Sequence, residues 1–139
     1  ILRCSNVFGF ELGRKTFFGA MLTSLTNDGC IKFNISPDTK KDFIPIEDCC
    51  EVIFQVISKK VTGVFNVGSG ISVKSGDLAQ AVIKGFGGGE FVCDSESIHG
   101  QFQMDVSSLR ELIDYPSITT DSILLNATKS GRQLREYTL

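Results

Sequence analysis

The sequence of 139 residues lacks the features that mark several common classes of protein. No apolar run approaches the ~20 residues that a membrane-spanning helix needs. The N-terminus has no basic segment followed by a cleavage site, so it does not resemble a signal peptide. The formal net charge of −2 gives no basic surface of the kind that binds nucleic acid. We therefore expect a cytoplasmic protein with no membrane partner and no nucleic-acid partner.

Metal and disulfide chemistry have little support in the sequence. There are five cysteines, an odd number, and none of them forms a C-x-x-C pair. His99 is the single histidine that could join them as a neutral ligand, whereas zinc sites need closely spaced sets of such ligands. Because most of the cysteines lie among apolar residues, we expect them to be reduced thiols that pack as small hydrophobic groups.

What the sequence does contain is the pattern of an α/β protein. Its hydrophobic share of 42% and charged share of 22% are those of an ordinary globular protein, and its length suits one domain or part of one. Apolar spacing predicts that strands alternate with helices, which favours parallel strand pairing. The expected strands cover 1–8, 30–35, 42–46, 64–67 and 91–93, and the expected helices cover 14–25, 47–57, 75–84, 105–113 and 120–137.

Two glycine-rich segments invite comparison with phosphate-binding loops. Gly85–Gly89 follows a predicted helix and precedes a predicted strand, whereas a dinucleotide-binding fingerprint follows a strand and opens a helix. We therefore interpret this segment as a flexible connection. Gly68–Gly70 does follow a strand, but the next helix begins several residues later, so a structural turn is the favoured interpretation there too.

Three segments are more specific when they are taken together. Arg3–Gly9 reads RCSNVFG, Lys41–Asp48 reads KDFIPIED, and Phe65–Gly70 reads FNVGSG. In order and spacing they resemble the motifs R-x-x-N-x-[YF]-G, R-D-[FY]-[IV]-x-V-x-D and [YF]-N-[VI]-G-x-G. These motifs belong to the C-terminal half of NAD-dependent epimerases/dehydratases of the extended short-chain dehydrogenase family. Residues 105–116 resemble a later element of that family, although Ser108 stands where a basic residue is usual and Arg110 follows two positions later.

The resemblance implies a fold and a division of the parent protein. We expect residues 1–139 to form a single partial domain, which is the C-terminal portion of a Rossmann-like fold. It would contain the last strands of the cofactor-binding sheet and a small substrate-binding subdomain. The family's catalytic Tyr-x-x-x-Lys and glycine-rich cofactor loop have no counterpart here, and the chain starts at Ile1 without an initiator methionine. We therefore expect the N-terminal cofactor-binding half to be absent from this chain.

The resemblance also implies site residues. Ser5 would lie along the nicotinamide, and Asn6 would hydrogen-bond the substrate diphosphate. Lys41 would reach the same diphosphate in place of the usual arginine, keeping the charge but losing the forked geometry. Phe33 would lie near the nucleobase. Plainer alternatives remain open: Asn6 satisfying backbone groups at a strand end, Lys41 as a surface lysine, and Phe33 as a core residue.

The function implied is that of a parent enzyme that binds NAD or NADP and a nucleotide-diphosphate sugar, and that forms a homodimer. Transient oxidation of the sugar would allow epimerisation, dehydration or reduction. This chain would be the substrate-binding portion, inactive alone. Two alternatives stay open, namely a fragment of a superfamily reductase that acts on a small carbonyl compound, and a non-catalytic binding remnant. Asp42 is expected to anchor a loop and Asp48 to cap a helix.

Overall fold

The computed structural model describes residues 1–11 and 15–139. Strands and helices alternate along most of the chain, and the predicted α/β class with parallel strand pairs is confirmed. In chain order the elements are β1 (Leu2–Cys4), β2 (Asn6–Phe8), α1 (Phe17–Asp28), β3 (Cys30–Phe33), β4 (Lys40–Pro45), α2 (Ile46–Ser58), β5 (Phe65–Val67), β6 (Ser72–Lys74), α3 (Ser75–Phe86), β7 (Glu90–Cys93), α4 (Ser107–Arg110) and α5 (Thr120–Thr138).

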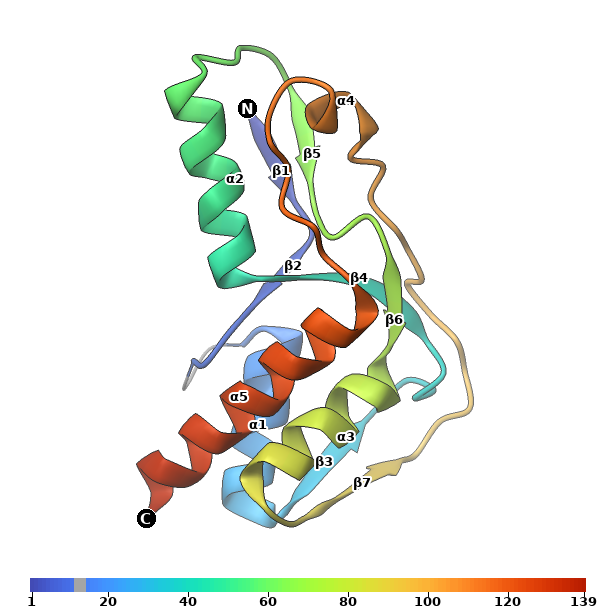
Figure 1. The fold of residues 1–139 in the computed structure, drawn as a ribbon. Coiled ribbons are helices and arrows are strands. Elements are labelled where there is room, and N and C mark those ends of the chain that lie inside the picture. The colour runs from blue at the N-terminus through green and yellow to red at the C-terminus, as the bar shows by residue number, and fades with distance from the viewer. Residues whose placement is uncertain (12–14) are drawn as a thin grey trace.

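The strands of the described residues form three small sheets (Figure 1). β1 pairs in parallel with β5, β2 with β4, and β3 with β7. β6 joins β4 in the antiparallel sense, which makes β4 the central strand of the order β2-β4-β6. In Figure 1 an upper part holds β1, β5, α2 and α4, and a lower part holds α1, β3, β7, α3 and α5. The β2-β4-β6 sheet lies between these two parts, and it carries the residues discussed below.

Helix α1 begins and ends at residues whose types explain its two boundaries. The hydroxyl of Thr16 accepts a hydrogen bond from the backbone N–H of Gly19 at 2.9 Å, so the helix begins at Phe17. Arg14, where the predicted helix starts, lies outside the described residues. Gly29 ends the helix in the left-handed conformation with φ 66°, as its lack of a Cβ allows. The buried face of the helix consists of Phe18, Gly19, Met21, Leu22 and Leu25.

Helices α3 and α5 cross at backbone contact. A Cβ atom at Gly85 would lie 2.0 Å from the carbonyl oxygen of Thr128, and one at Gly131 would lie 2.1 Å from that of Val82. No side chain fits at either position unless the helices separate. Gly85 is therefore part of α3, and the segment predicted as a flexible connection begins only at Gly87, which ends the helix with φ 92°.

Several sequence predictions are wrong in detail. β6 was not predicted, because its three residues include one apolar side chain, Val73. The helix expected over 105–113 covers only Ser107–Arg110. Asp48 lies in the first turn of α2 but does not cap it, because Pro45 occupies the N-cap position and no side chain bonds there. Pro45 is the last residue of β4, the central strand of its sheet.

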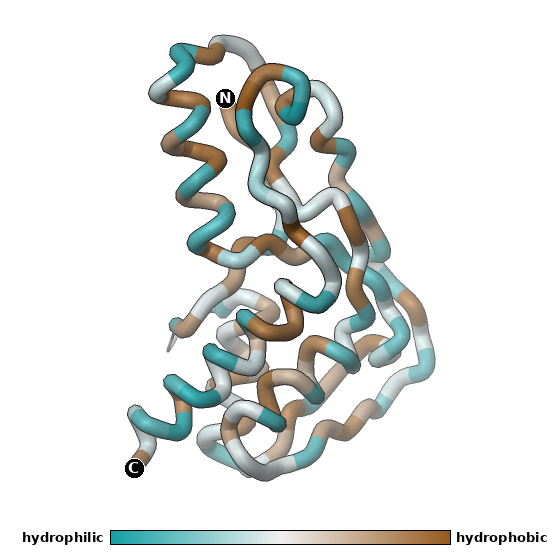
Figure 2. Tube along the Cα trace, viewed as in Figure 1, coloured by the Kyte–Doolittle hydropathy of each residue, from teal (hydrophilic) through white to brown (hydrophobic). Residues whose placement is uncertain are grey.

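A single cluster of buried apolar side chains connects the elements. Its largest members include Phe8, Phe18 and Phe43, each no more than 2% exposed. Figure 2 shows hydrophobic and hydrophilic residues alternating along α2 and α5, as expected for helices with one buried face. Among the described residues, no helix combines the length and hydropathy that crossing a membrane requires.

Candidate functional site

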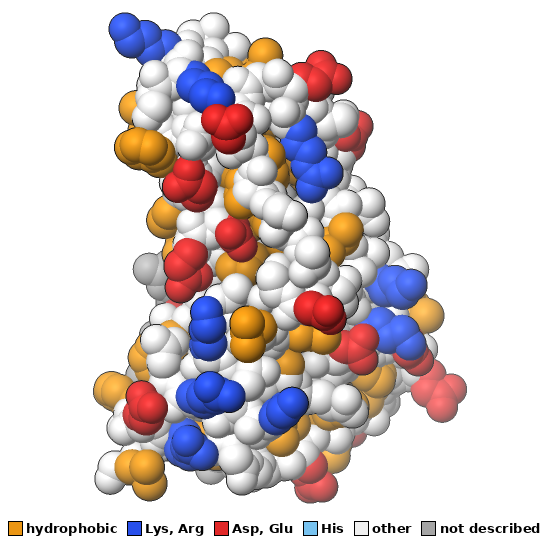
Figure 3. Space-filling model, in the orientation of Figure 1, with side chains coloured by type: hydrophobic (Ala, Val, Ile, Leu, Met, Phe, Trp, Pro, Cys, Tyr) orange, Lys and Arg blue, Asp and Glu red, His pale blue; other side chains and the backbone are white. Residues whose placement is uncertain are grey.

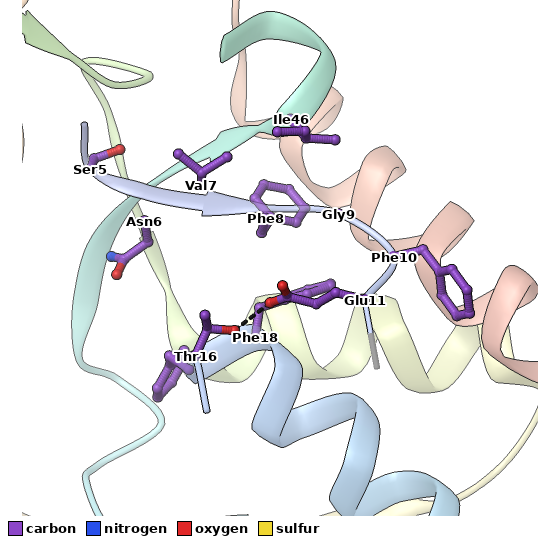
Figure 4. Close-up of a pocket in the computed structure, with 11 residues that line it drawn as sticks. Ser5, Asn6, Val7, Phe8, Gly9, Phe10, Glu11, Thr16, Phe18 and Ile46 are labelled. Atoms are coloured by element: carbon purple, nitrogen blue, oxygen red, sulfur yellow. Dashed lines mark hydrogen bonds between the residues drawn. The ribbon is translucent and has the colours of Figure 1, made fainter. Parts of the chain in front are cut away.

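A pocket of about 590 Å³ lies between β2 and the start of α1 (Figure 4). It contains two of the residues that the sequence singled out, Ser5 just before β2 and Asn6 at its start. The pocket wall is part aromatic and part polar, as small-molecule sites usually are. Its lining consists of Ser5, Asn6, Val7, Phe8, Gly9, Phe10, Glu11, Thr16, Phe17, Phe18 and Ile46.

Asn6 is held in place by the neighbouring strand. Its side-chain amide nitrogen donates to the backbone carbonyl of Asp42 at 2.9 Å, across the parallel pair of β2 and β4. The alternative that Asn6 satisfies a backbone group is therefore confirmed for one of its N–H groups. An asparagine amide has two N–H groups and a carbonyl oxygen, so this bond leaves further capacity for a ligand.

Asp42 connects three separate segments of the chain. Its carboxylate is fully buried, and Oδ1 accepts from the hydroxyl of Ser5 at 3.0 Å, from the backbone N–H of Ser69 at 2.8 Å and from the hydroxyl of Ser69 at 2.9 Å. Oδ2 accepts from the backbone N–H of Gly70 at 3.0 Å and of Met104 at 3.1 Å. A buried carboxylate is tolerated only with such partners. The predicted anchoring role of Asp42 is confirmed.

The hydrogen bonds to Asp42 also determine whether the Gly68–Gly70 turn can bind a phosphate. The backbone N–H groups of Ser69 and Gly70 both point at Asp42, so they are not available to a phosphate. The interpretation as a structural turn is confirmed. The hydroxyl of Ser5 likewise donates to the carboxylate of Asp42.

Polar groups also gather at the opposite end of the pocket. The hydroxyl of Thr16 donates to Oε1 of Glu11 while it accepts the N–H that caps α1. Figure 4 shows this pair facing β2 across the pocket. Glu11 was not predicted as a site residue, because nothing in its local sequence distinguishes it from a loop glutamate.

Lys41 and Phe33 both contact the ring of Phe17. The ammonium of Lys41 lies 5.5 Å from the centre of the Phe17 ring, within the range of a cation–π contact. Phe33 stacks against the same ring with a centroid distance of 6.1 Å and an interplanar angle of 26°. Phe17 lines the pocket, whereas Lys41 and Phe33 do not. Phe33 is 4% exposed and packs edge-on against Phe91, so it lies in the core.

Tyr115, which was not predicted as a site residue, supports the same turn through Gly68. Its hydroxyl donates to the carbonyl of Gly68 at 2.8 Å and accepts from the N–H of the same residue at 3.1 Å. Burial raises the pKa of Tyr115 above its ordinary value, against the opposing effects of the Gly68 backbone and of Arg110. The guanidinium of Arg110 lies 5.3 Å from the centre of the Tyr115 ring and donates to the carbonyl of Ser69.

The cysteines do not form a site in the described part of the chain. All five are free thiols, and no group of three or more His, Cys, Asp or Glu side chains there could hold a metal ion. Burial is the main reason that the pKa of Cys49 is raised to about 12, with a contribution from Cys4. His99 is exposed on the segment that follows β7.

Comparison with solved structures identifies the fold. A novel NAD-dependent NDP-hexosamine 5,6-dehydratase, TunA, matches 98% of this chain with a TM-score of 0.78 and 16% sequence identity. This chain has the fold of one portion of the NAD-dependent epimerases and dehydratases. UDP-glucuronic acid 4-epimerase from Bacillus cereus, solved with UDP-glucuronic acid and NAD, matches 96% of the chain with a TM-score of 0.74 and 20% identity.

The match covers only part of each solved protein. The epimerase Mth375 of Methanothermobacter thermautotrophicus matches 99% of this chain with a TM-score of 0.78 and 15% identity, but 44% of its own length is covered. The chain covers 45% of both TunA and the Bacillus cereus epimerase. It therefore spans less than half the length of these proteins. No model of a known protein family matches the sequence.

Proposed function

We propose that this chain is the substrate-binding portion of an NAD(P)-dependent enzyme that epimerises or dehydrates a nucleotide-diphosphate sugar. The observation that carries the proposal is the pocket of about 590 Å³ beside β2, in which Asn6 is fixed by the backbone of Asp42. The fold supports it, because the Bacillus cereus structure with the same fold was solved with UDP-glucuronic acid and NAD. In this proposal residues 1–139 form one partial domain of a longer enzyme.

The proposed roles follow the sequence predictions. Asn6 donates its second N–H to a diphosphate oxygen, which a neutral amide does without adding charge. Lys41 supplies the positive charge for the same group after it swings away from the ring of Phe17. Phe17 is better placed than Phe33 to contact the base, because Phe17 lines the pocket beside β2 and Phe33 does not. Ser5 borders the nicotinamide and is oriented by Asp42.

The chemistry of hydride transfer belongs to the cofactor, which accepts and returns a hydride when bound. The residues of this chain would bind and orient the sugar nucleotide and exclude water from it. We propose that the 139 residues alone have no turnover, because none of these roles includes the acid–base step. The parent enzyme is proposed to be a homodimer that uses NAD or NADP.

Isothermal titration of the chain with UDP-glucuronic acid tests the proposal. Lys41→Ala is expected to weaken binding at least about tenfold, because it removes a charge from the diphosphate site. Lys40→Ala is the matched control, since Lys40 is the exposed neighbour on the same strand. Two results contradict the proposal. One is that both variants bind UDP-glucuronic acid equally strongly, and the other is that the unmodified 139-residue chain is folded and does not bind it. Titration with UDP alone distinguishes a nucleotide-sugar enzyme from a reductase of small carbonyl compounds, because the substrate of such a reductase contains no nucleotide.

A further inference from the structure

A groove of about 470 Å³ lies between α3 and α5, and it shares no residue with the pocket beside β2. Each helix contributes residues at helical spacing, so each presents one face to the groove. The lining consists of Asp77, Gln80, Ala81, Lys84, Asp121, Leu124, Leu125, Thr128 and Arg132. The two helices are in backbone contact through Gly85 and Gly131, so close packing fixes the walls of the groove relative to each other.

The charges of this groove are separated along its length. Asp77 lies in the first turn of α3, and Asp121 lies in the first turn of α5. Lys84 follows farther along α3, and Arg132 farther along α5. Figure 1 shows both helices running in the same direction, so the two carboxylates mark one end of the groove and the two cations mark the other. Figure 3 shows acidic side chains where these helices begin and basic side chains farther along them.

The middle of the groove is apolar. Leu125 is 54% exposed, Leu124 is partly buried beside it, and Ala81 of α3 is buried. At about 1.5 Å per residue, Leu125 lies roughly 6 Å along the helix axis from Asp121 and roughly 10 Å from Arg132. An apolar centre with charged residues at its rim is the composition of a protein–protein contact.

The pattern of acidic end, apolar middle and basic end is complementary to itself. None of the four charged side chains forms an ion pair with another described residue, since the ion pairs there join other residues. A second copy, turned about a two-fold axis through the middle of the groove, brings its acidic end to the basic end of the first. Asp121 then faces the partner's Arg132, Leu125 lies near the axis, and each pair of opposite charges forms twice.

We propose that the α3–α5 groove is a two-fold contact between two copies of this chain. The apolar middle excludes water, and the charges at the two ends fix the antiparallel orientation. The nine lining residues of each copy are fewer than the roughly 20–30 of a standard interface, so the contact is weak and reversible. It does not depend on the proposed function, because none of its residues lines the pocket beside β2.

Sedimentation velocity of the 139-residue chain at increasing concentrations measures this contact. We expect a reversible dimer whose dissociation constant rises with salt, because salt screens the exposed charges. Arg132→Asp places like charges at both ends of the contact and is expected to raise the dissociation constant at least about tenfold. Lys129→Asp is the matched control and is expected to leave the dimer unchanged, because Lys129 is an exposed residue of α5 that does not line the groove.

A charge exchange distinguishes the two-fold contact from a general effect of charge. Asp121→Arg alone is expected to weaken the dimer as Arg132→Asp does, again because like charges meet. An equimolar mixture of the two variants is expected to form a heterodimer with about the affinity of the unmodified chain, since every acidic group then faces a basic one. Both positions are exposed, so circular dichroism is expected to show each variant folded. A mixture of folded variants that does not associate overturns the proposal.

Two further results overturn it. One is an unmodified chain that stays monomeric at millimolar concentration, which would leave the groove to a partner other than a second copy. The other is a dimer that both single variants leave intact, which would form through another surface, such as the exposed Phe54 and Ile57 of α2.

Discussion

Asn6 and Asp42 are joined across two parallel strands by a hydrogen bond of 2.9 Å from the side-chain amide to the backbone carbonyl. The same Asp42 binds the hydroxyl of Ser5 through its carboxylate. One buried residue of β4 thus orients both of the β2-side residues that the sequence singled out. The positions of Ser5 and Asn6 in the pocket depend on these hydrogen bonds to Asp42, which can be tested without a ligand.

Replacing Asp42 by asparagine should destabilise the fold. One carboxylate oxygen becomes an NH2 group, which cannot accept from Gly70 and Met104 or, if flipped, from Ser69 and Ser5. Leaving buried donors without a partner costs about 2–4 kcal/mol. Urea unfolding measures the loss. Asp38→Asn is the control: the carboxylate of Asp38 is exposed and pairs with Lys74 at the surface, so this variant should leave the midpoint nearly unchanged. Equal effects of the two variants would refute the anchoring role.

The α3–α5 crossing predicts sharp differences among glycines. Gly85→Ala and Gly131→Ala should each destabilise the protein by about 1–3 kcal/mol or more, because the new methyl group meets a backbone carbonyl that cannot move aside. Gly88→Ala should be neutral, since nothing lies within 4 Å of a Cβ there. Thermal unfolding of the three variants makes the comparison. A destabilised Gly88→Ala with an unaffected Gly131→Ala would show that the helices cross elsewhere.

Tyr115 should make stability sensitive to alkaline pH. Burial raises the pKa of Tyr115 in the folded protein, so the phenol of the unfolded chain loses its proton at a lower pH than that of the folded protein. Burial of the neutral phenol therefore adds to the free energy of unfolding, and ionisation of Tyr115 removes that contribution. The stabilisation is complete below the unfolded pKa of about 10 and is lost as the pH rises through the folded pKa. Tyr115→Phe should lower the free energy of unfolding by about 1–2 kcal/mol at neutral pH, because Gly68 loses both of its hydrogen bonds to the Tyr115 hydroxyl. The difference in urea midpoint between the unmodified chain and Tyr115→Phe should become smaller above pH 10. A difference that does not change with pH would rule out a contribution of Tyr115 ionisation to stability.

The thiols should differ in reactivity. Cys4 and Cys50 are exposed, whereas Cys49 is buried and its pKa is raised to about 12. Alkylation requires the thiolate, so iodoacetamide at pH 8 should label Cys4 and Cys50 within minutes and Cys49 only after unfolding. Peptide mass spectrometry reads out each site. Rapid labelling of Cys49 in the folded chain would contradict its burial on the inner side of α2.

The sequence predicted those features that depend on local pattern. Helix α1 and its end at Gly29 follow from apolar spacing and from one residue free to adopt positive φ. The donors of Asp42 could not be predicted, because they come from residues 5, 69, 70 and 104, which only the fold brings together. β6 escaped prediction because three residues with one apolar side chain carry no period. The burial of Phe33 against Phe17 and Phe91 likewise depends on tertiary packing.

The most direct test of the central claim is to map UDP-glucuronic acid onto the chain by NMR. After a dispersed amide spectrum has established that the chain is folded, the account predicts that the largest shifts fall on Ser5, Asn6 and Phe17, which line the pocket beside β2. The amides of α5 should not move. Shifts confined to the α3–α5 surface, or no shifts at millimolar ligand, would contradict the claim that this chain binds a nucleotide sugar.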